Sequence, residues 1–87
     1  TVLIRDNVIE NGSDRAFRFG HFGGSSITIT GNRLNNVGDN DGQNCKAESV
    51  GNATINLDGN YWAGKTPAQA IHTSMGVIDN EPLDSFS

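Results

Sequence analysis

One pattern occurs three times in this chain and constrains its fold more than any other feature. Each copy has two apolar residues two positions apart, an asparagine three positions later, and another apolar residue two positions after the asparagine. The asparagines are separated by 25 and 28 residues, an interval typical of chains that return to the same place once per repeat. The copies are Val2, Ile4, Asn7, Ile9; Ile27, Ile29, Asn32, Leu34; and Ile55, Leu57, Asn60, Trp62.

The apolar residues at alternate positions predict short β-strands, because alternate side chains of a strand point to the same side. The three-residue step to the asparagine breaks this alternation and predicts a bend. We expect Asn7, Asn32 and Asn60 to take a left-handed or bridging backbone conformation at that bend, with a second strand after it.

The three asparagines also predict a ladder. If equivalent strands pair in parallel, successive asparagines lie about 4.8 Å apart and their amides can bond to one another along the axis. The alternative is that Asn7, Asn32 and Asn60 are ordinary turn residues whose positions coincide.

A third strand is predicted in each repeat. Phe17 and Phe19 precede the second copy of the pattern by the same intervals that separate Cys45 and Ala47 from the third. We expect the small pair to stack on the large pair, with Cys45 as a buried apolar residue. Three strands per repeat match one rung of a parallel β-helix, whereas leucine-rich repeats would show a recurring Leu-x-x-Leu-x-Leu. The sequence therefore predicts an all-β solenoid of about three rungs over residues 1–64.

Residues 65–87 are predicted to form a C-terminal cap within the same domain. Residues 65–72 indicate a short capping helix: Thr66 is a suitable N-cap, Pro67 fits the first helical position, and Gln69 completes a capping box with Thr66.

Val77 and Ile78 are predicted to form a final short strand. Trp62, Ile71 and Phe86 could cover the last rung, because an exposed parallel edge invites aggregation. The start of the chain has no such cover, so we expect further rungs upstream, in a longer parent chain.

Composition excludes several classes of function. The net charge is −4, which argues against a nucleic-acid partner, since phosphate binding requires an excess of Lys and Arg. No apolar run approaches the roughly 20 residues that span a bilayer, so no membrane span is expected. A single cysteine excludes an internal disulfide.

The repeated Ile-x-Ile-x-x-Asn-x-Ile and the ending of the chain resemble the right-handed parallel β-helix superfamily, often called pectate-lyase-like. The ending consists of residues 59–64 (GNYWAG), Pro67 and residues 77–83 (VIDNEPL), and it is similar to the terminal rung of many secreted and surface proteins. Ala63 stands where glycine is usual, and Ile78 is an additional residue. The resemblance covers nearly the whole chain and implies a right-handed coil, an extracellular or cell-surface location, and the C-terminal rungs of a larger protein.

The superfamily contains polysaccharide lyases, glycoside hydrolases, uronate epimerases, phage tailspikes and adhesin stalks, so the fold does not settle the function. Neither the acid pairs of polygalacturonases nor the aspartate cluster of calcium-dependent pectate lyases is matched in this sequence. We therefore expect a non-catalytic segment of an extracellular protein that binds or processes a polysaccharide; the parent could be a lyase, a glycosidase or an epimerase. The alternative is a purely structural or adhesive stalk module of a surface protein or phage tailspike.

Candidate substrate-binding residues follow from the resemblance, because the third strand of each rung borders the usual substrate groove. Arg15 and Arg18 in one rung and Lys46 and Glu48 in the next could pair with the carboxylates of an acidic polysaccharide, and Glu48 could act as an acid or base. Tyr61 could stack on a sugar ring. The alternative is a solvated face with cross-strand charge pairs.

The loop 39–44 (DNDGQN) is rich in oxygen ligands, and Asp39 and Asp41 are candidate calcium ligands. The loop lacks the complete spacing and the distant glutamate of an EF-hand, so a plain turn-rich loop is the alternative. No other cofactor is expected.

Overall fold

The computed structural model describes residues 1–19, 26–47 and 54–87. These residues form nine short strands and one four-residue helix, which confirms the all-β prediction. The elements are β1 (Val2–Arg5), β2 (Val8–Gly12), β3 (Phe17–Phe19), β4 (Ser26–Thr30), β5 (Arg33–Val37), β6 (Cys45–Ala47), β7 (Thr54–Asn56), β8 (Tyr61–Trp62), α1 (Pro67–Ala70) and β9 (Ile71–Thr73).

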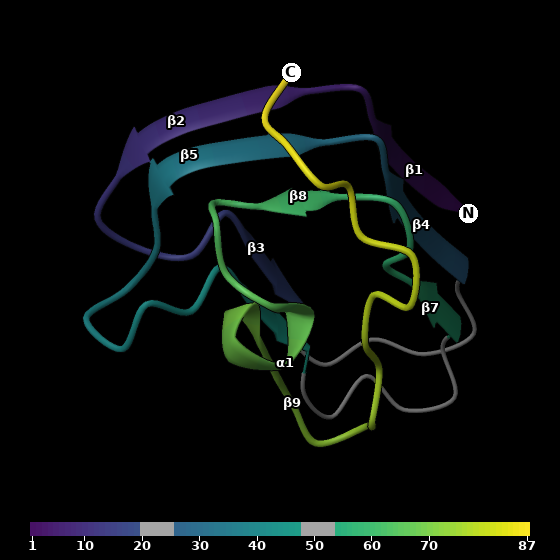
Figure 1. Cartoon of the computed structure of the whole chain (residues 1–87). Helices are drawn as coiled ribbons and strands as arrows, with labels where there is room; N and C mark the ends of the chain where they lie inside the picture. The colour runs from purple at the N-terminus through teal and green to yellow at the C-terminus, as the bar shows by residue number, and fades with distance from the viewer. Residues whose placement is uncertain (20–25, 48–53) are drawn as a thin grey trace.

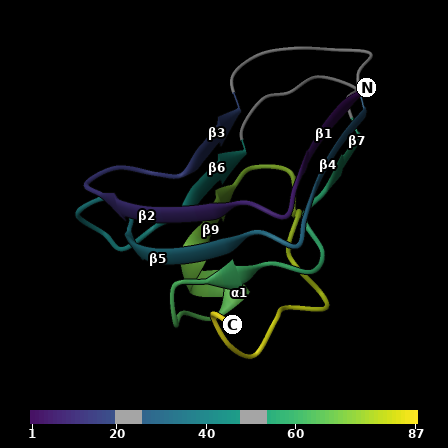
Figure 2. The same ribbon diagram turned by 90° about the horizontal axis from the view of Figure 1, so that it is seen from above.

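The strands form three parallel sheets, and each sheet takes one strand from each of three passes of the chain. The strand orders are β1-β4-β7, β2-β5-β8 and β3-β6-β9. The chain therefore visits the sheets in the same order three times and moves along by one strand per pass. Figures 1 and 2 show equivalent strands of the passes lying side by side.

The pairing register agrees with the alignment of the repeats. In the first sheet Ile27 pairs with Val2 on one side and with Ile55 on the other. In the second sheet Leu34 lies between its equivalents in the same way. The three additional residues of the second repeat leave this register unchanged, because they fall outside the paired strands.

The third sheet confirms one prediction and corrects another. Cys45 pairs with Phe17, so the small residue stacks on the large one as expected. The last strand, however, is Ile71–Thr73 and not Val77 with Ile78, which lie outside regular secondary structure. Ile71 leaves the helical conformation, with φ −108° and ψ 118°, and pairs with Cys45.

The predicted helix is present but shorter than residues 65–72. Gln69 N donates to Thr66 Oγ1 at 3.3 Å and Thr66 N donates to Gln69 Oε1 at 3.1 Å, which is the predicted capping box, and Pro67 occupies the first turn. The helix ends at Ala70 because the next residue buries its side chain in the third sheet, with 7% of Ile71 exposed. The third pass therefore continues beyond residue 64 into the segment assigned to the cap.

The core lies between the three sheets. Ile29, Leu34 and Cys45 are 0% exposed, and Trp62 is 1% exposed. The Trp62 ring meets Phe17 edge to face, with ring centroids 6.3 Å apart, a favourable aromatic geometry. Trp62 and Cys45 are therefore core residues, as the alignment predicted.

The asparagine ladder is present. The backbone N–H and the Nδ2 of Asn7 both donate to Asn32 Oδ1 at 3.0 Å. Asn32 repeats this on Asn60 Oδ1, at 3.1 Å from its backbone N–H and 3.0 Å from Nδ2. Asn32 and Asn60 are completely buried, so the ladder satisfies polar groups that have no access to water.

The same amides hold the strand ends beside the bend. Asn60 Nδ2 donates to the carbonyl of Leu57 in its own pass at 2.7 Å and to that of Ile29 in the preceding pass at 2.8 Å. Asn32 Nδ2 donates to Thr30 O in its own pass at 3.2 Å and to Ile4 O in the preceding pass at 3.1 Å. Each buried amide thus links two passes through its donor as well as through its acceptor.

The backbone of the bend differs from the expectation. The residues with positive φ are those preceding the asparagines, namely Asp6 (57°), Gly31 (69°) and Gly59 (86°). The left-handed alternative for Asn7, Asn32 and Asn60 was therefore wrong, and a bridging conformation at these asparagines stays a prediction. Two of the three positions are glycine because a Cβ is unfavourable in this conformation, and at Gly59 it would also lie 2.9 Å from Thr30 Oγ1. The residue before the asparagine makes the turn, so the amide can point into the ladder.

A second buried asparagine, Asn44, joins the passes at the corner before the third sheet. Its carbonyl accepts hydrogen bonds from Ala16 N at 2.9 Å and from Phe17 N at 3.2 Å, and its own N–H donates to Ala70 O at 2.7 Å. Its Nδ2 donates to Val37 O. The repeat pattern did not identify this residue, because the equivalent positions in the other two passes are alanines.

Beyond β9 the tail closes the ladder with a carboxylate. Asp79 is 3% exposed. Its Oδ2 accepts from Asn60 N at 2.9 Å and from Trp62 Nε1 at 2.8 Å, and its Oδ1 accepts from Gly59 N at 2.9 Å. An ionised carboxylate only accepts hydrogen bonds, which suits the end of a row of donors. Figure 2 shows this tail at the opposite end of the passes from β2.

We expect Asn32→Ala to lower the free energy of unfolding by about 3 kcal/mol, because it leaves buried donors and acceptors in two neighbouring passes without partners. Urea denaturation followed by circular dichroism measures the loss. Asn35→Ala is the matched control, since Asn35 is exposed and makes a 3.4 Å hydrogen bond to Glu10. Equal unfolding midpoints for the two variants would contradict the role of the ladder.

Candidate functional site

The outer face of the third sheet carries a row of basic side chains. Arg18 pairs with Lys46, and Lys46 pairs with His72, each at the middle of a three-residue strand. The first residues of these strands are buried, so the middle residues point outward. Neighbouring strands lie about 4.8 Å apart, and the three side chains therefore follow one another closely along the sheet. We call Arg18, Lys46 and His72 the basic row.

Sequence reasoning identified Arg18 and Lys46 but missed His72, which it placed in the helix. The sequence did contain a signal for this strand. Residues 71–73 (Ile-His-Thr) resemble residues 45–47 (Cys-Lys-Ala), because in both segments an apolar residue is followed by a basic residue and then by a small one. Glu48, the predicted acid or base of this face, lies outside the described residues, and its role stays a prediction.

The side chain of Arg15 binds the loop before β6. Its Nη2 lies 2.8 Å from Asp39 Oδ2 and donates to Gln43 Oε1 at 3.1 Å. The side chains of Arg15 and Asp39 are only 17% and 16% exposed. The structure therefore gives Arg15 a partner within the chain, although the sequence suggested an acidic ligand.

Asp39 organises the same loop. Its Oδ1 accepts from Gln43 N at 2.8 Å and from Asp41 N at 3.0 Å. The hydrogen bond from Gln43 lowers the pKa of the Asp39 carboxyl; burial opposes this, and the Asp41 N–H and the charge of Arg15 lower it further. Asp39 is thus an ionised group held by the loop it stabilises.

The predicted calcium ligands, Asp39 and Asp41, lie in the loop before β6. Residues 1–19, 26–47 and 54–87 contain no group of three or more His, Cys, Asp or Glu side chains that could hold a metal ion. Asp39 is engaged by Arg15, and Asp41 is exposed. Calcium binding by Asp39 and Asp41 stays a prediction from the loop sequence alone.

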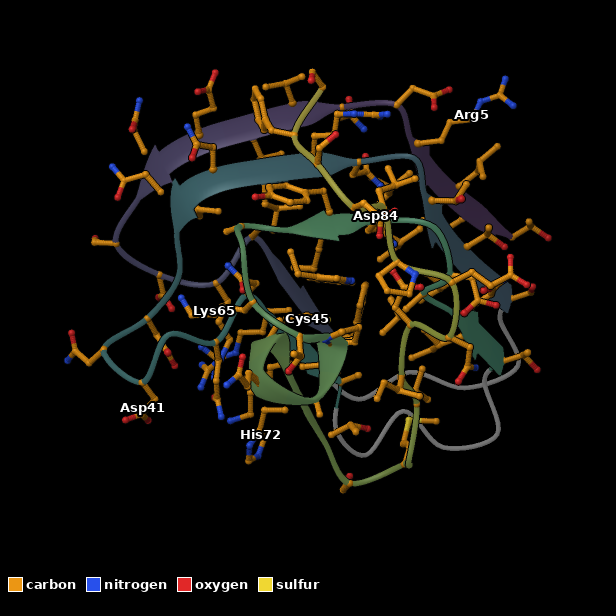
Figure 3. All side chains as sticks on the ribbon, viewed as in Figure 1. Arg5, Asp41, Cys45, Lys65, His72 and Asp84 are labelled. Carbon is orange, nitrogen blue, oxygen red and sulfur yellow. The ribbon has the colours of Figure 1, made fainter. Side chains whose placement is uncertain are left out.

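A surface recess of about 340 Å³ lies beside this loop. Lys65 contributes a positive charge to it and passes directly over Gly42, where a Cβ would lie 2.7 Å from Lys65 Cε. Figure 3 shows Lys65, Asp41 and His72 on the same side of the molecule. The lining residues are Gly12, Asn36, Val37, Gly38, Asp39, Gly42, Ala63 and Lys65.

Tyr61 lies on another sheet. It belongs to β8, where it pairs with Arg33 of β5, and its ring meets Phe86 of the tail edge to face with centroids 6.3 Å apart. Tyr61 borders a separate hollow of about 470 Å³ together with Pro67 and Pro82. The predicted sugar-stacking residue is therefore not brought together with the basic row.

Cys45 has the properties of a core residue. Burial raises the pKa of its thiol to about 12, so the side chain is neutral at physiological pH. Its place between Phe17 and Ile71 in the third sheet agrees with this assignment.

Comparison of the chain with family models, curated proteins and solved structures found no match. Within the part of the chain that the structure describes, no helix is long and apolar enough to cross a membrane.

We expect the stability that Asp39 contributes to fall in acid. Because its folded pKa is lowered, this contribution is complete above the ordinary value of 3.8 and is lost as the pH falls below 3.8 and through the folded value. Unfolding midpoints measured between about pH 6 and pH 2 should therefore change less steeply in Asp39→Asn than in the parent chain. Asp41→Asn, which alters an exposed carboxylate two positions away, should keep the parent profile; an unchanged profile in Asp39→Asn would contradict the assignment.

We expect Cys45 to be inert in the folded chain. With a pKa near 12 in place of 9.0, its thiolate fraction at pH 8 falls at least about a hundredfold, and its burial blocks the reagent. A disulfide reagent such as Ellman's should react at the normal rate only after denaturant is added. Rapid reaction of the native chain would contradict the burial of Cys45.

Proposed function

We propose that this chain is a right-handed parallel β-helix of the pectate-lyase-like type, and that its third sheet binds an acidic polysaccharide outside the cell or at its surface. The three parallel sheets visited in a fixed order support the helix. Connections between parallel strands of one sheet are right-handed in nearly all proteins, which supports the handedness. The buried asparagine ladder supports the likeness to this superfamily.

The basic row carries the binding proposal. Arg18, Lys46 and His72 are in register on one face, although the chain as a whole has a net charge of −4. A polymer with a carboxylate on each sugar can meet several of these groups at once, and charge-assisted hydrogen bonds to carboxylates are stronger than neutral ones. The positive charges of Arg18 and Lys46 on an acidic protein also favour the approach of an anionic chain to that face.

The recess beside the 38–43 loop supports the same proposal. Lys65 is exposed there, and Asp39 is already neutralised by Arg15, so the recess has a positive side chain without an opposing unpaired carboxylate from Asp39. A sugar unit that carries a carboxylate would be attracted to it.

We propose binding and not catalysis for this segment. Hydrolysis of a glycosidic bond uses two carboxyl groups on either side of the bond. The strands β3, β6 and β9 contain no Asp or Glu, and Asp39 is held by Arg15. Catalytic groups of a parent lyase, glycosidase or epimerase would then come from outside the described residues.

We further propose that upstream rungs of the parent chain cover the first pass. Val2 is 44% exposed, whereas its partner Ile27 in the second pass is 4% exposed. A further rung paired with β1 and β2 would bury the first pass as the first pass buries the second.

A structural or adhesive stalk is the second candidate. The buried ladder and its carboxylate end favour it, because they make a stiff, satisfied coil whether or not a ligand is bound. In a stalk the basic row would be a solvated face, and its residues could be replaced without effect on function.

Titration calorimetry with polygalacturonate distinguishes the two. We expect the double variant Arg18→Ala/Lys46→Ala to bind at least about tenfold more weakly than the parent chain, which corresponds to about 1.4 kcal/mol. The matched control is Arg5→Ala, which removes an arginine that is 65% exposed on another sheet and 3.8 Å from Asp6. A neutral galactan should not bind, and added salt should weaken binding to the acidic polymer. If the parent chain binds no acidic glycan, or the double variant binds equally well, the stalk is favoured.

A further inference from the structure

A pair of asparagine side chains on the outside of the second sheet has no counterpart in the third pass. Asn36 Nδ2 donates to Asn11 Oδ1 at 2.9 Å, and both residues are exposed. In the register of this sheet the next residues are Ala63 and Gly64, which carry no amide. Asn36 and Ala63 both line the recess of about 340 Å³ described above, so the recess lies where this outer row of amides ends.

The chain turns away from the second sheet at the same place. Lys65 N donates to Trp62 O at 2.9 Å, and the two residues between them, Ala63 and Gly64, have φ of 54° and 84°. Positive φ at both central residues is typical of a type I′ turn. The turn is followed by Lys65, whose Cε would lie 2.7 Å from a Cβ on Gly42. An exposed ammonium group therefore borders the recess next to the loop before β6.

The recess offers a ligand one acceptor and one cation. The Nδ2 of Asn36 is taken by Asn11, and no donor within residues 1–19, 26–47 and 54–87 bonds its Oδ1. Lys65 forms no ion pair within the same residues. Asp39 also lines the recess, but its carboxylate is paired with Arg15 at 2.8 Å.

The size and walls of the recess suit one sugar ring. Its volume is at the lower end of the roughly 300–1,000 Å³ of small-molecule sites. Val37 and Ala63 give it apolar surface against which the C–H groups of a ring can pack.

We propose that this recess holds one uronic-acid unit of the polysaccharide, with the sugar carboxylate on Lys65 Nζ and one sugar hydroxyl donating to Asn36 Oδ1. The inference rests on the proposed function and adds to it the place where a single sugar is recognised. A neutral sugar supplies the hydroxyl without the carboxylate, and a simple carboxylate supplies the charge without the hydroxyl. Only a sugar acid satisfies both groups.

Nuclear magnetic resonance with galacturonate, galactose and acetate as probes tests this site. In the isotope-labelled full chain we expect galacturonate to shift the amide signals of Gly38 and Gly42, which line the recess, until they saturate. Galactose and acetate should bind at least about tenfold more weakly, because each meets only one of the two groups. Signals of the recess that do not respond to galacturonate overturn the inference.

Ala63→Asn fills the recess in a chain that still folds. Asparagine tolerates positive φ better than alanine, and Asn-Gly is a preferred pair in a type I′ turn, so the unfolding temperature should not fall. We expect this variant to bind galacturonate at least about tenfold more weakly than the parent chain. Ala68→Asn makes the same change at an exposed position of α1 outside the recess and should bind as the parent chain does.

Equal affinity of Ala63→Asn and the parent chain for galacturonate overturns the inference. If Ala63→Asn does not fold, Lys65→Met decides the matter, because it removes the charge of an exposed side chain and keeps an unbranched stem beside Gly42. Binding that Lys65→Met weakens at least about tenfold supports the inference, and undiminished binding overturns it.

Calorimetry with polygalacturonate separates this failure from failure of the proposed function. If Ala63→Asn and the parent chain bind the polymer equally while Arg18→Ala/Lys46→Ala binds it weakly, the single-sugar site is overturned and the proposed function stands. If the parent chain binds no polygalacturonate, both are overturned.

Discussion

The hydrogen bond from a backbone N–H at one bend to the asparagine oxygen of the next pass is the interaction on which this structure depends. The Asn32 N–H and Asn60 Oδ1, 3.1 Å apart, fix how far the chain advances per pass. With that advance fixed, Leu34 lies over Trp62 in the second sheet. The positions of the outer side chains follow from this register, so the basic row is a consequence of buried amides on the far side of the core.

The spacing of the asparagines was sufficient to predict which strands pair and in which register, because an asparagine that recurs once per pass at the same bend leaves little freedom in alignment. It was insufficient at the bend, where glycine at positions 31 and 59 and not the asparagine adopts positive φ. The end of the chain was harder, because Ile71–Thr73 is a three-residue strand directly after a helix. A strand this short is decided by its tertiary pairing with Cys45 and not by local propensity.

The part of the candidate site that depends on the register could be predicted from the sequence. Arg18 and Lys46 could be placed on one face from the alignment, but the ion pair of Arg15 with Asp39 joins residues from two passes and has no local signature. Asp79 was missed for another reason. It occurs once, outside the repeats, and its carboxylate accepts the hydrogen bond that an asparagine oxygen accepts in the earlier passes.

The orientation of the ladder gives the coil an electrical polarity. At each bend the backbone N–H of the asparagine points toward the last pass and the Oδ1 that accepts from it points toward the first, so the dipoles of these bonds add along the axis. The Nδ2 groups of Asn32 and Asn60 also donate back to the preceding pass. The negative charge of Asp79 lies where the N–H ends emerge, the position that an anion prefers at the start of a helix. The carboxylate is therefore matched to the direction of these aligned bonds as well as to its own hydrogen-bond donors.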